Sequence, residues 1–349
     1  MWCHRNFTTS DILLQKLIEC FNTPQEMSPN NTTRIQKSVI NTLKFWLQEC
    51  PNDFLQETLS LSTKTFIEYD LSKETQHSNY SRELKLSLKK CEKLLSKQED
   101  LLFLYQKSAP PPEPQVPRNI FSPDFKFESV PEVEIARQLT LHAHHLICLI
   151  GMSELSSVAW EQSSGEAEEK CPNIVILENW LQRITMWVKE EIKVATERKM
   201  RTKRLASFAL LCEVLFELNN YHSLAGVLQG ILMEAKASGS KELPSVFDKE
   251  WAKAPQGEEQ LKFLNETAIP TVFGQRPKYH VKPCVPYLTD FLGTVSKVIK
   301  SEPHWIMEGS KMVNFNKALK LSLFLKQFRE FQTHLYSLLP VHQVQEYFE

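Results

Sequence analysis

Histidine and cysteine residues gather in one stretch of this 349-residue chain, where metal chemistry would be possible. His142, His145 and Cys148 are spaced three residues apart, so they lie roughly on one side of a predicted helix. Such side chains can bind Zn²⁺, but three ligands from one helix rarely close a tetrahedral site, and no second group of ligands is evident. The alternative is that these residues, together with His144, are packing and surface residues. We favour that alternative and expect neither a metal site nor a cofactor.

Sequence motifs for nucleotide binding and covalent catalysis are absent from the chain. It contains only 9 glycines and neither GxxxxGK(S/T) nor GxGxxG, which disfavours a Gly-rich phosphate loop. None of the 8 cysteines forms a CxxC pair, and no spacing singles out a base for a cysteine nucleophile. These observations favour a binding module over a small-molecule enzyme.

A short run of basic residues begins another predicted helix. It contains Arg198, Lys199, Arg201, Lys203 and Arg204. Positive charge at a helix start opposes the helix dipole. The run is therefore either a site for an acidic partner surface or a solvated junction between helices. The whole chain has a formal net charge of −1 and a pI near 6.8, so we expect no nucleic-acid partner and no membrane insertion.

The remaining pattern is that of helices rather than strands. Apolar residues recur at helical spacing in most segments, and no period-2 strand is longer than about four residues, except near 279–281. The Pro-rich segment 108–117 suits neither a helix nor a central strand, and it predicts a domain boundary. No signal peptide and no apolar run of ~18 residues is present. The sequence therefore predicts an all-α, cytosolic protein with two helical domains.

The last third of the chain has the pattern of two helices joined by a short connection. One helical run extends from Pro286 to about Lys300, and a second extends from Met312 to about Leu335. Together they predict an αα-hairpin that projects from a helical body.

Four blocks of residues occur in the order that is typical of one family. They are Glu134–Leu141 (EIARQLTL); Trp160 with Pro172–Ile174 and Trp187; Glu217–Leu224 (ELNNYHSL); and Pro283–Leu288 (PCVPYL) followed by Val313–Lys317 (VNFNK). Over roughly residues 120–345, the chain resembles the catalytic domain of Ras-type guanine-nucleotide exchange factors of the son-of-sevenless class. Arg5–Thr9 and Val39–Trp46 resemble the exchanger motif of that family, a helical module that supports the catalytic domain.

The resemblance implies a domain organisation. Residues 1–107 correspond to a helical module like the exchanger motif (REM-like), which begins partway into the family pattern and is N-terminally incomplete. Residues 108–118 correspond to a Pro-rich linker. Residues 119–349 correspond to a larger all-helical catalytic domain, against which the module packs and from which a helical hairpin, 284–335, protrudes.

The resemblance also implies an activity. Similar proteins accelerate GDP release from a Ras-like GTPase and let GTP replace it, without covalent catalysis. The implied partner is a Ras-superfamily small GTPase in its GDP-bound or nucleotide-free state, and the exchanger is expected to be a monomer. In the family, the hairpin displaces the first switch loop of the GTPase. It places an apolar side chain and a carboxylate where Mg²⁺ and phosphate would sit.

The family's functional residues map onto particular positions of this chain. The inserted apolar residue falls on Ser296 and the carboxylate on Lys300, with Glu302 as another carboxylate nearby, and these three are the implied catalytic residues. A lysine attracts phosphate where the family repels it. The implied GTPase-binding residues are Asn179, Arg201, Asn219, Asn220, Ala225, Tyr287, Gly293 and Lys297.

Other functions stay open at this point. Ser296 and Lys300 favour a catalytically impaired pseudo-exchange factor, which uses the same fold as a protein-interaction scaffold. A helical adaptor unrelated to GTPases is a third interpretation, because helical architecture alone constrains function weakly. A eukaryotic cytoplasmic regulator and a bacterial effector delivered into the host cytosol both suit this sequence.

Overall fold

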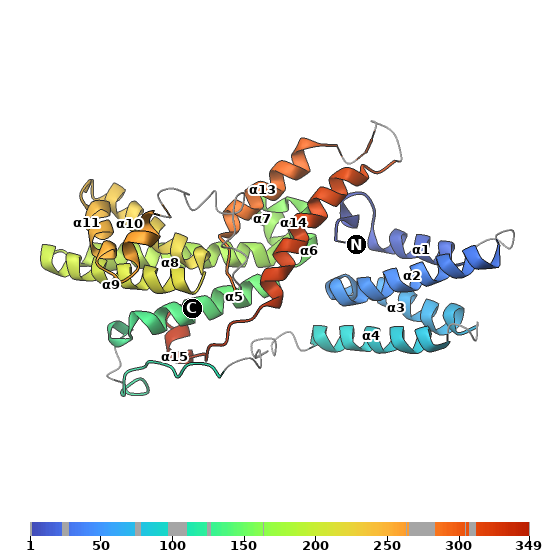
Figure 1. Ribbon diagram of the computed structural model, residues 1–349, viewed down its shortest axis with the longest axis horizontal. Coiled ribbons are helices and arrows are strands. Elements are labelled where there is room, and N and C mark those ends of the chain that lie inside the picture. The colour runs from blue at the N-terminus through green and yellow to red at the C-terminus, as the bar shows by residue number, and fades with distance from the viewer. Residues whose placement is uncertain are drawn as a thin grey trace. The chain divides into compact units, whose positions relative to one another are not determined.

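The computed structural model describes residues 2–22, 28–73, 78–96, 110–123, 127–162, 164–262, 264, 283–303, 305–306 and 312–348. Over these ranges the regular structure is helical, and strand-like pairing is limited to two isolated β-bridges, Asn220 with Val285 and Trp305 with Val313. The all-α fold class predicted from the sequence is confirmed (Figure 1). The chain forms two compact units.

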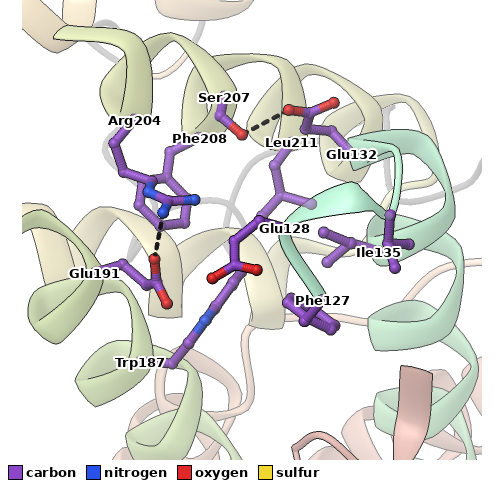
Figure 2. A pocket seen from close by; sticks show the side chains of 11 residues that line it. Phe127, Glu128, Glu132, Ile135, Trp187, Glu191, Arg204, Ser207, Phe208 and Leu211 are labelled. Carbon is purple, nitrogen blue, oxygen red and sulfur yellow. Dashed lines mark hydrogen bonds and ion pairs between the residues drawn. The ribbon is translucent and has the colours of Figure 1, made fainter. Parts of the chain in front are cut away.

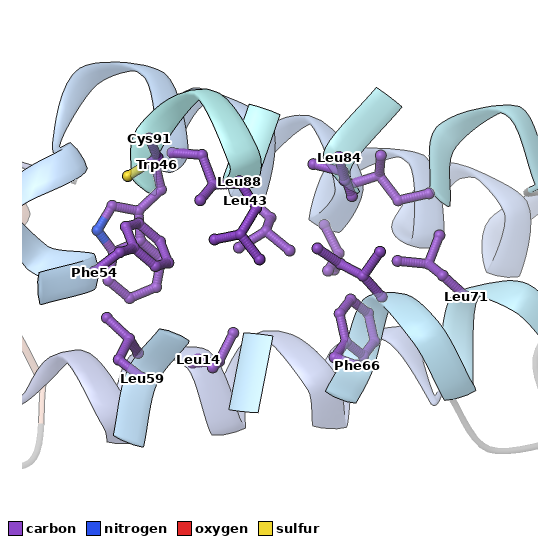
Figure 3. Close-up of a cluster of buried hydrophobic side chains, with 14 of the residues drawn as sticks. Leu14, Leu43, Trp46, Phe54, Leu59, Phe66, Leu71, Leu84, Leu88 and Cys91 are labelled. Atoms are coloured by element: carbon purple, nitrogen blue, oxygen red, sulfur yellow. The ribbon is translucent and has the colours of Figure 1, made fainter. Parts of the chain in front are cut away.

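The first unit comprises Met1–Phe103, Gly151–Ser157 and Ile299–Leu325. Residues Val39, Leu43 and Trp46 recur at helical spacing on one of its helices and are buried, with side chains from the neighbouring helices, in one hydrophobic core (Figure 3). Its helices are α1 (Ser10–Phe21), α2 (Pro29–Glu49), α3 (Glu57–Thr65), α4 (Ser78–Ser96) and α6 (Met152–Ser157), with the short turns η1 (His4–Asn6), η2 (Pro51–Leu55), η3 (Phe66–Asp70) and η4 (Leu71–Lys73).

The second unit comprises Leu104–Ile150, Val158–Val298 and Lys326–Glu349. Its longer helices α5, α8, α9 and α10 pack on one another. Its helical elements are η7 (Phe127–Ser129), α5 (Glu132–Leu149), η8 (Ala159–Glu161), α7 (Ser164–Lys170), α8 (Pro172–Val194), α9 (Arg198–Glu217), α10 (Tyr221–Ala237), α11 (Leu243–Ala252) and α15 (His342–Gln345).

A close approach of α8 and α10 is central to the second unit. A Cβ atom added at Gly230 would lie 2.6 Å from the carbonyl oxygen of Thr185 and 2.7 Å from Cβ of Val188, so only glycine suits this position. Nearby, Oγ1 of Thr185 donates a hydrogen bond of 3.2 Å to the carbonyl oxygen of Gly226. The two helices are therefore fixed side by side along their length.

The two helices predicted near the C-terminus are α13 (Leu288–Ser301) and α14 (Phe315–Thr333). Each contributes residues to both units. In the second unit the rings of Phe291 and Phe328 join α13 to α14, with centroids 5.0 Å apart. In the first unit the amide of Ile306 donates to the carbonyl oxygen of Met312 at 3.0 Å. The hairpin is thus paired at its base and near its turn.

Some sequence predictions concern segments outside the described residues. The sequence pattern also predicts a helix from Tyr80 to about Tyr105, which corresponds to α4 as far as Ser96. The rest of that predicted helix lies outside the described residues, as does the strand-like segment 279–281. Residues 110–117 of the Pro-rich segment form no helix, whereas 108 and 109 lie outside the described ranges. In the part of the chain that the structure describes, no helix is both long and apolar enough to cross a membrane.

Candidate functional site

The turn between α9 and α10 holds the segment that leads into α13. Asn219 adopts the left-handed backbone conformation (φ 55°), which asparagine tolerates better than most residues. Its carbonyl oxygen accepts a hydrogen bond of 3.0 Å from the Val285 amide, and the Val285 carbonyl oxygen accepts one of 2.9 Å from the Tyr221 amide. The side chain of Asn219 also donates to the Pro283 carbonyl oxygen at 3.4 Å. The base of the hairpin is therefore tied to the start of α10.

Asn220 is fully buried and caps α10. Its Oδ1 accepts a hydrogen bond of 3.0 Å from the amide of Ser223. Its Nδ2 donates to Oγ1 of Thr140 at 3.0 Å, which links the cap to α5. These contacts are those of a residue that caps one helix and braces it against another.

His222 is buried directly after this cap and is held in one tautomer. Its Nδ1 accepts a hydrogen bond of 3.4 Å from the Leu288 amide, so its Nε2 carries the hydrogen and donates to the Leu177 carbonyl oxygen at 3.2 Å. Burial lowers the pKa of His222 to about 4, so the ring is neutral at neutral pH. A neutral imidazole thus joins the start of α13 to α8 and α10.

Two side-chain contacts complete the hairpin base. The hydroxyl oxygen of Tyr287 accepts a hydrogen bond of 3.0 Å from Nε2 of Gln229 on α10. The hydroxyl of Thr289 donates to the carboxylate of Glu178 on α8 at 3.1 Å. Burial raises the pKa of Glu178, and the hydrogen bond from Thr289 opposes that shift. Tyr287 and Thr289 therefore brace the hairpin against both helices.

An exposed stripe runs along α13 from this base. Thr289, Gly293 and Lys297 follow one another at four-residue spacing, and all three are exposed. On α8, Asn179 is exposed and directly follows Glu178, the residue that binds Thr289. Three of the residues predicted to bind a partner, Asn179, Gly293 and Lys297, therefore lie exposed around the hairpin base.

Ser296 does not share that exposure. It neighbours the stripe on α13, but its side chain is buried, and its Oγ donates a hydrogen bond of 2.6 Å to Oε1 of Glu161 in η8. Ser296, the residue predicted for the family's inserted position, thus faces its own unit rather than solvent.

Lys300 and Glu302 lie at the end of α13, within the first unit. Lys300 is exposed. The carboxylate of Glu302 pairs with Lys320 and accepts a hydrogen bond of 3.4 Å from Nδ2 of Asn314. The hydrogen bond from Lys320 lowers the pKa of Glu302. Lys317 donates to the backbone carbonyl oxygen of Glu302, so this residue closes the hairpin turn onto α14.

Two other residues predicted to bind a partner are held inside the second unit. Ala225 is buried in α10. Arg201 is half-buried, and its Nε donates to the Ala195 carbonyl oxygen at 3.1 Å, which closes the turn between α8 and α9. Both residues support helices rather than extend the exposed stripe.

Sequence reasoning missed four exposed apolar residues on the two helices that hold the hairpin base. Ile176 and Met186 lie on α8, and Leu232 and Met233 lie on α10. Large apolar side chains exposed on neighbouring helices mark a protein-binding surface. The sequence could have indicated them, because helical periodicity places these apolar residues outside the buried face of their own helix. We group these four residues with the exposed polar residues of α8 and α13 and call the set the α8–α10–α13 surface, defined as Ile176, Asn179, Met186, Leu232, Met233, Gly293 and Lys297.

The histidines of α5 take part in packing. The ring of His142 stacks on that of Trp180 with centroids 4.0 Å apart, and Nε2 of His144 lies 3.1 Å from the Phe331 carbonyl oxygen. Burial lowers the pKa of His142 and of His144 to about 4. Among the described residues, no three His, Cys, Asp or Glu side chains are arranged to hold a metal ion.

A small cavity of about 30 Å³ lies between α5, α8 and α9 (Figure 2). Trp187 lines it, Arg204 pairs with Glu191 at 3.0 Å, and the hydroxyl of Ser207 donates to Glu132 at 2.6 Å. The cavity has room for about one water molecule. It is too small for a nucleotide or an organic cofactor.

Comparison with known families gives two matches. Residues 134–319 match the model of the RasGEF domain, and residues 1–66 match that of the RasGEF N-terminal motif. The first match covers more than half of the 349 residues and includes α5, α8, α9, α10 and α13.

Several proteins of Dictyostelium discoideum are similar to the chain over almost all of its length. Ras guanine nucleotide exchange factor A is 28% identical over 349 aligned positions, which cover 99% of this chain and 56% of the relative. Ras guanine nucleotide exchange factor J is 26% identical, covering 98% of this chain and 42% of the relative. Factor I is 27% identical, covering 98% and 40%. The chain spans about half the length of these relatives.

Proposed function

We propose that this chain, which belongs to the RasGEF domain family, is a guanine-nucleotide exchange factor for a Ras-family GTPase. It promotes release of GDP and loading of GTP. The observation that carries this proposal is the family match over residues 134–319, which contains every helix of the α8–α10–α13 surface. The names of the similar Dictyostelium proteins support it.

The character of the α8–α10–α13 surface supports a protein partner. It combines apolar residues such as Met186 and Leu232 with the polar residues Asn179 and Lys297, and all of them are exposed. Protein interfaces commonly have an apolar centre and a polar rim. The cavity between α5, α8 and α9 is too small for a nucleotide. In this proposal the partner binds the nucleotide.

Exchange by this route needs no covalent step. The chain binds most tightly to the GTPase that holds no nucleotide. By linkage, it therefore weakens nucleotide binding by the same factor by which nucleotide weakens its own binding. Each tenfold of this coupling corresponds to ~1.4 kcal/mol. The hairpin of α13 and α14 enters the nucleotide site, and incoming GTP then displaces the exchanger.

The residues of the hairpin have different roles in this proposal. Gly293 lets the partner approach α13 closely, since a Cβ atom there would meet nothing within 4 Å. Lys297 contacts the GTPase, and Lys300 faces its phosphates. Ser296 and Glu302 keep the hairpin in shape through their contacts with Glu161 and Lys320.

The residues below the hairpin position it. Asn219 and Asn220 fix the segment before α13, and Tyr287 braces it from α10. Ala225 and Arg201 support the helices that carry the surface. These five residues therefore act on the partner through the shape of the binding surface.

A second candidate function is favoured by specific observations in the hairpin. Ser296 is buried on Glu161, Lys300 occupies the family's carboxylate position, and the carboxylate of Glu302 is engaged by Lys320. A hairpin of this kind also suits a pseudo-exchange factor, which binds a GTPase as a scaffold without accelerating exchange. Binding without acceleration is the property that separates the two functions.

The proposal also covers the domain organisation of the chain and its location in the cell. Residues 1–107 form a REM-like module, 108–118 a linker, and 119–349 the catalytic domain with its hairpin at 284–335. The chain acts as a monomer in the cytoplasm on the GDP-bound GTPase and holds the nucleotide-free form. The source of the similar proteins favours a eukaryotic regulator over a delivered bacterial protein.

Release of a fluorescent GDP analogue from a panel of Ras-family GTPases tests the proposal. The panel contains Ras, Rap, Ral and more distant relatives, each in excess unlabelled GTP. We expect faster release from at least one member. Binding of the same GTPases without nucleotide is measured in parallel, because binding without faster release would favour the scaffold.

A further inference from the structure

The turn between α8 and α9 carries a concentration of positive charge. Residues 189–204 include seven basic and three acidic residues, a net charge of +4, in a chain whose formal net charge is −1. The first turn of α9 contains no acidic residue, although the helix dipole favours acidic residues there. The acidic Glu197 occupies the N-cap position, but the basic residues that follow it oppose the helix dipole.

Some of these cations are engaged within the unit. Arg204 points toward the cavity and pairs with Glu191 at 3.0 Å (Figure 2). The Nε of Arg201 donates to the Ala195 carbonyl oxygen at 3.1 Å. These two basic residues therefore stabilise the fold of the second unit. The remaining basic residues of α9 have no such structural role in the contacts described above.

Arg198, Lys199 and Lys203 form the outward charge of this turn. All three are exposed, and no carboxylate in the described part of the chain forms an ion pair with any of them. Lys199 and Lys203 are four residues apart, so they lie side by side on one face of α9. Three cations of this kind repel one another, which an anionic partner would relieve.

Two apolar side chains are exposed among the cations. Val194, the last residue of α8, is 74% exposed, and Met200, in the first turn of α9, is 56% exposed. They lie on either side of the three-residue connection 195–197. The turn therefore presents two isolated apolar side chains beside several cations, with one exposed carboxylate, Glu197, between them.

We propose that this turn docks on the surface of an anionic lipid bilayer. The docking residues are Val194, Arg198, Lys199, Met200 and Lys203, which we call the α8–α9 corner. Anionic headgroups complement the cations, and isolated apolar side chains can be buried at the boundary between headgroups and acyl chains. A protein partner of ordinary size would require a broader apolar centre than two isolated side chains. The contact is peripheral and does not depend on exchange activity.

Co-sedimentation of the full chain with vesicles tests the proposal. One set of vesicles contains equal parts of phosphatidylserine and phosphatidylcholine, and the other contains phosphatidylcholine alone. We expect binding to the first set only, and weaker binding as salt is added, because salt screens the attraction. Absence of binding to the phosphatidylserine vesicles at low salt would overturn the proposal, as would equal binding to both sets.

Charge reversal locates the contact. The combined Arg198→Glu, Lys199→Glu and Lys203→Glu variant should bind the anionic vesicles at least about a hundredfold more weakly, since the loss of each basic residue alone removes about a fivefold factor. The matched control reverses three exposed lysines of α4, Lys85, Lys89 and Lys90, and changes the net charge equally. We expect the control to keep most of the binding. An equal loss in both variants would overturn the assignment to the α8–α9 corner.

A second variant keeps the three basic residues of the α8–α9 corner and removes its two exposed apolar side chains. Val194→Ser combined with Met200→Ser should weaken vesicle binding about tenfold, because less apolar surface is buried. Unchanged binding would contradict the apolar part of the proposal. If the chain ignores vesicles but charge reversal at the corner slows exchange on a GTPase without lipid, the corner binds an acidic protein and the proposal is wrong.

Discussion

Ser296 donates a hydrogen bond of 2.6 Å to the carboxylate of Glu161, and this contact turns its side chain away from the α8–α10–α13 surface. On α13 it neighbours Gly293 and Lys297, which are both exposed. The serine onto which the family's inserted residue was expected to map therefore packs within its own unit. A partner that approaches α13 meets Gly293 and Lys297 first.

Replacing Ser296 with alanine should lower stability rather than activity. The change removes a hydrogen bond to a carboxylate, so we expect the free energy of unfolding to fall by about 1 kcal/mol in urea titration. Exchange at saturating GTPase should stay within about twofold. Ser322→Ala removes a hydroxyl that bonds only within α14 and should cost less than about 0.5 kcal/mol. Lost exchange at unchanged stability would show that Ser296 itself meets the GTPase.

Two glycine-to-alanine changes should have opposite effects on stability. Gly230→Ala places a Cβ atom 2.6 Å from the Thr185 carbonyl oxygen, so α8 and α10 must separate, at a cost of about 2 kcal/mol or more. Gly293→Ala meets nothing within 4 Å and should stabilise α13 by about 0.5 kcal/mol. Chemical unfolding of both variants checks the pair. Equal effects would mean that α8 and α10 do not pack as described.

Stability should fall as pH decreases from about 6.5 toward about 4. The pKa of His222 is about 4 in the folded chain, against 6.5 for an unperturbed histidine. The pKa values of His142 and His144 are also lowered to about 4. Between these values the unfolded chain binds more protons, so protonation favours unfolding. Each histidine contributes up to about 1.4 kcal/mol per pH unit.

Urea unfolding at about pH 7 and about pH 5.5 measures this dependence. His222→Gln should reduce the loss of stability between the two pH values, because glutamine keeps a donor and an acceptor but does not titrate in this range. His342→Gln, at an exposed histidine of α15, is the matched control. An identical pH dependence in wild type and His222→Gln would contradict the burial of a neutral ring.

Leu232→Asp should impair exchange without unfolding the chain. The side chain is 57% exposed on the α8–α10–α13 surface, so a carboxylate there disturbs an apolar contact with the partner. We expect exchange efficiency to fall about tenfold or more and stability to change by less than about 0.5 kcal/mol. Leu86→Asp, at a leucine of α4 that is 55% exposed, should leave exchange unchanged. An equal loss of exchange efficiency in the Leu232→Asp and Leu86→Asp variants would contradict the proposal that the α8–α10–α13 surface binds the GTPase.

Lys300→Glu should raise the exchange rate. It replaces a cation that attracts phosphate with a carboxylate that repels it, and the change of two charge units near the phosphates should increase GDP release about tenfold. His142→Gln, on the packing face of α5, should leave the rate unchanged. A slower Lys300→Glu variant, or a rate sensitive to His142 and not to Lys300, would show that the hairpin is placed incorrectly.

Much of the fold was predictable because helical periodicity is strong in this chain. The buried positions Val39, Leu43 and Trp46 of α2 recur at the spacing that the sequence shows. The capping role of Asn220 agrees with the general preference of asparagine for helix starts. Local patterns of this kind do not depend on the rest of the fold.

The site was less predictable because it depends on contacts between distant residues. The carboxylate of Glu161 binds a hydroxyl 135 residues away on α13, and no local pattern indicates that pairing. Exposure of Leu232 and Met233 likewise depends on which side of α10 meets α8, which Gly226 and Gly230 determine. Family resemblance supplied positions such as Ser296, but only tertiary packing decides whether a side chain there reaches a partner.

The most direct test of exchange activity is the rate of GDP release from the GTPase panel with and without the chain. A fluorescent GDP analogue is displaced by excess GTP, and its dissociation rate is followed by stopped-flow fluorescence. We predict acceleration of about a hundredfold or more for at least one GTPase, which corresponds to an activation free energy of GDP release that is lower by about 2.7 kcal/mol. An unchanged rate across the whole panel, including any GTPase that binds the chain in its nucleotide-free form, would contradict the proposed function.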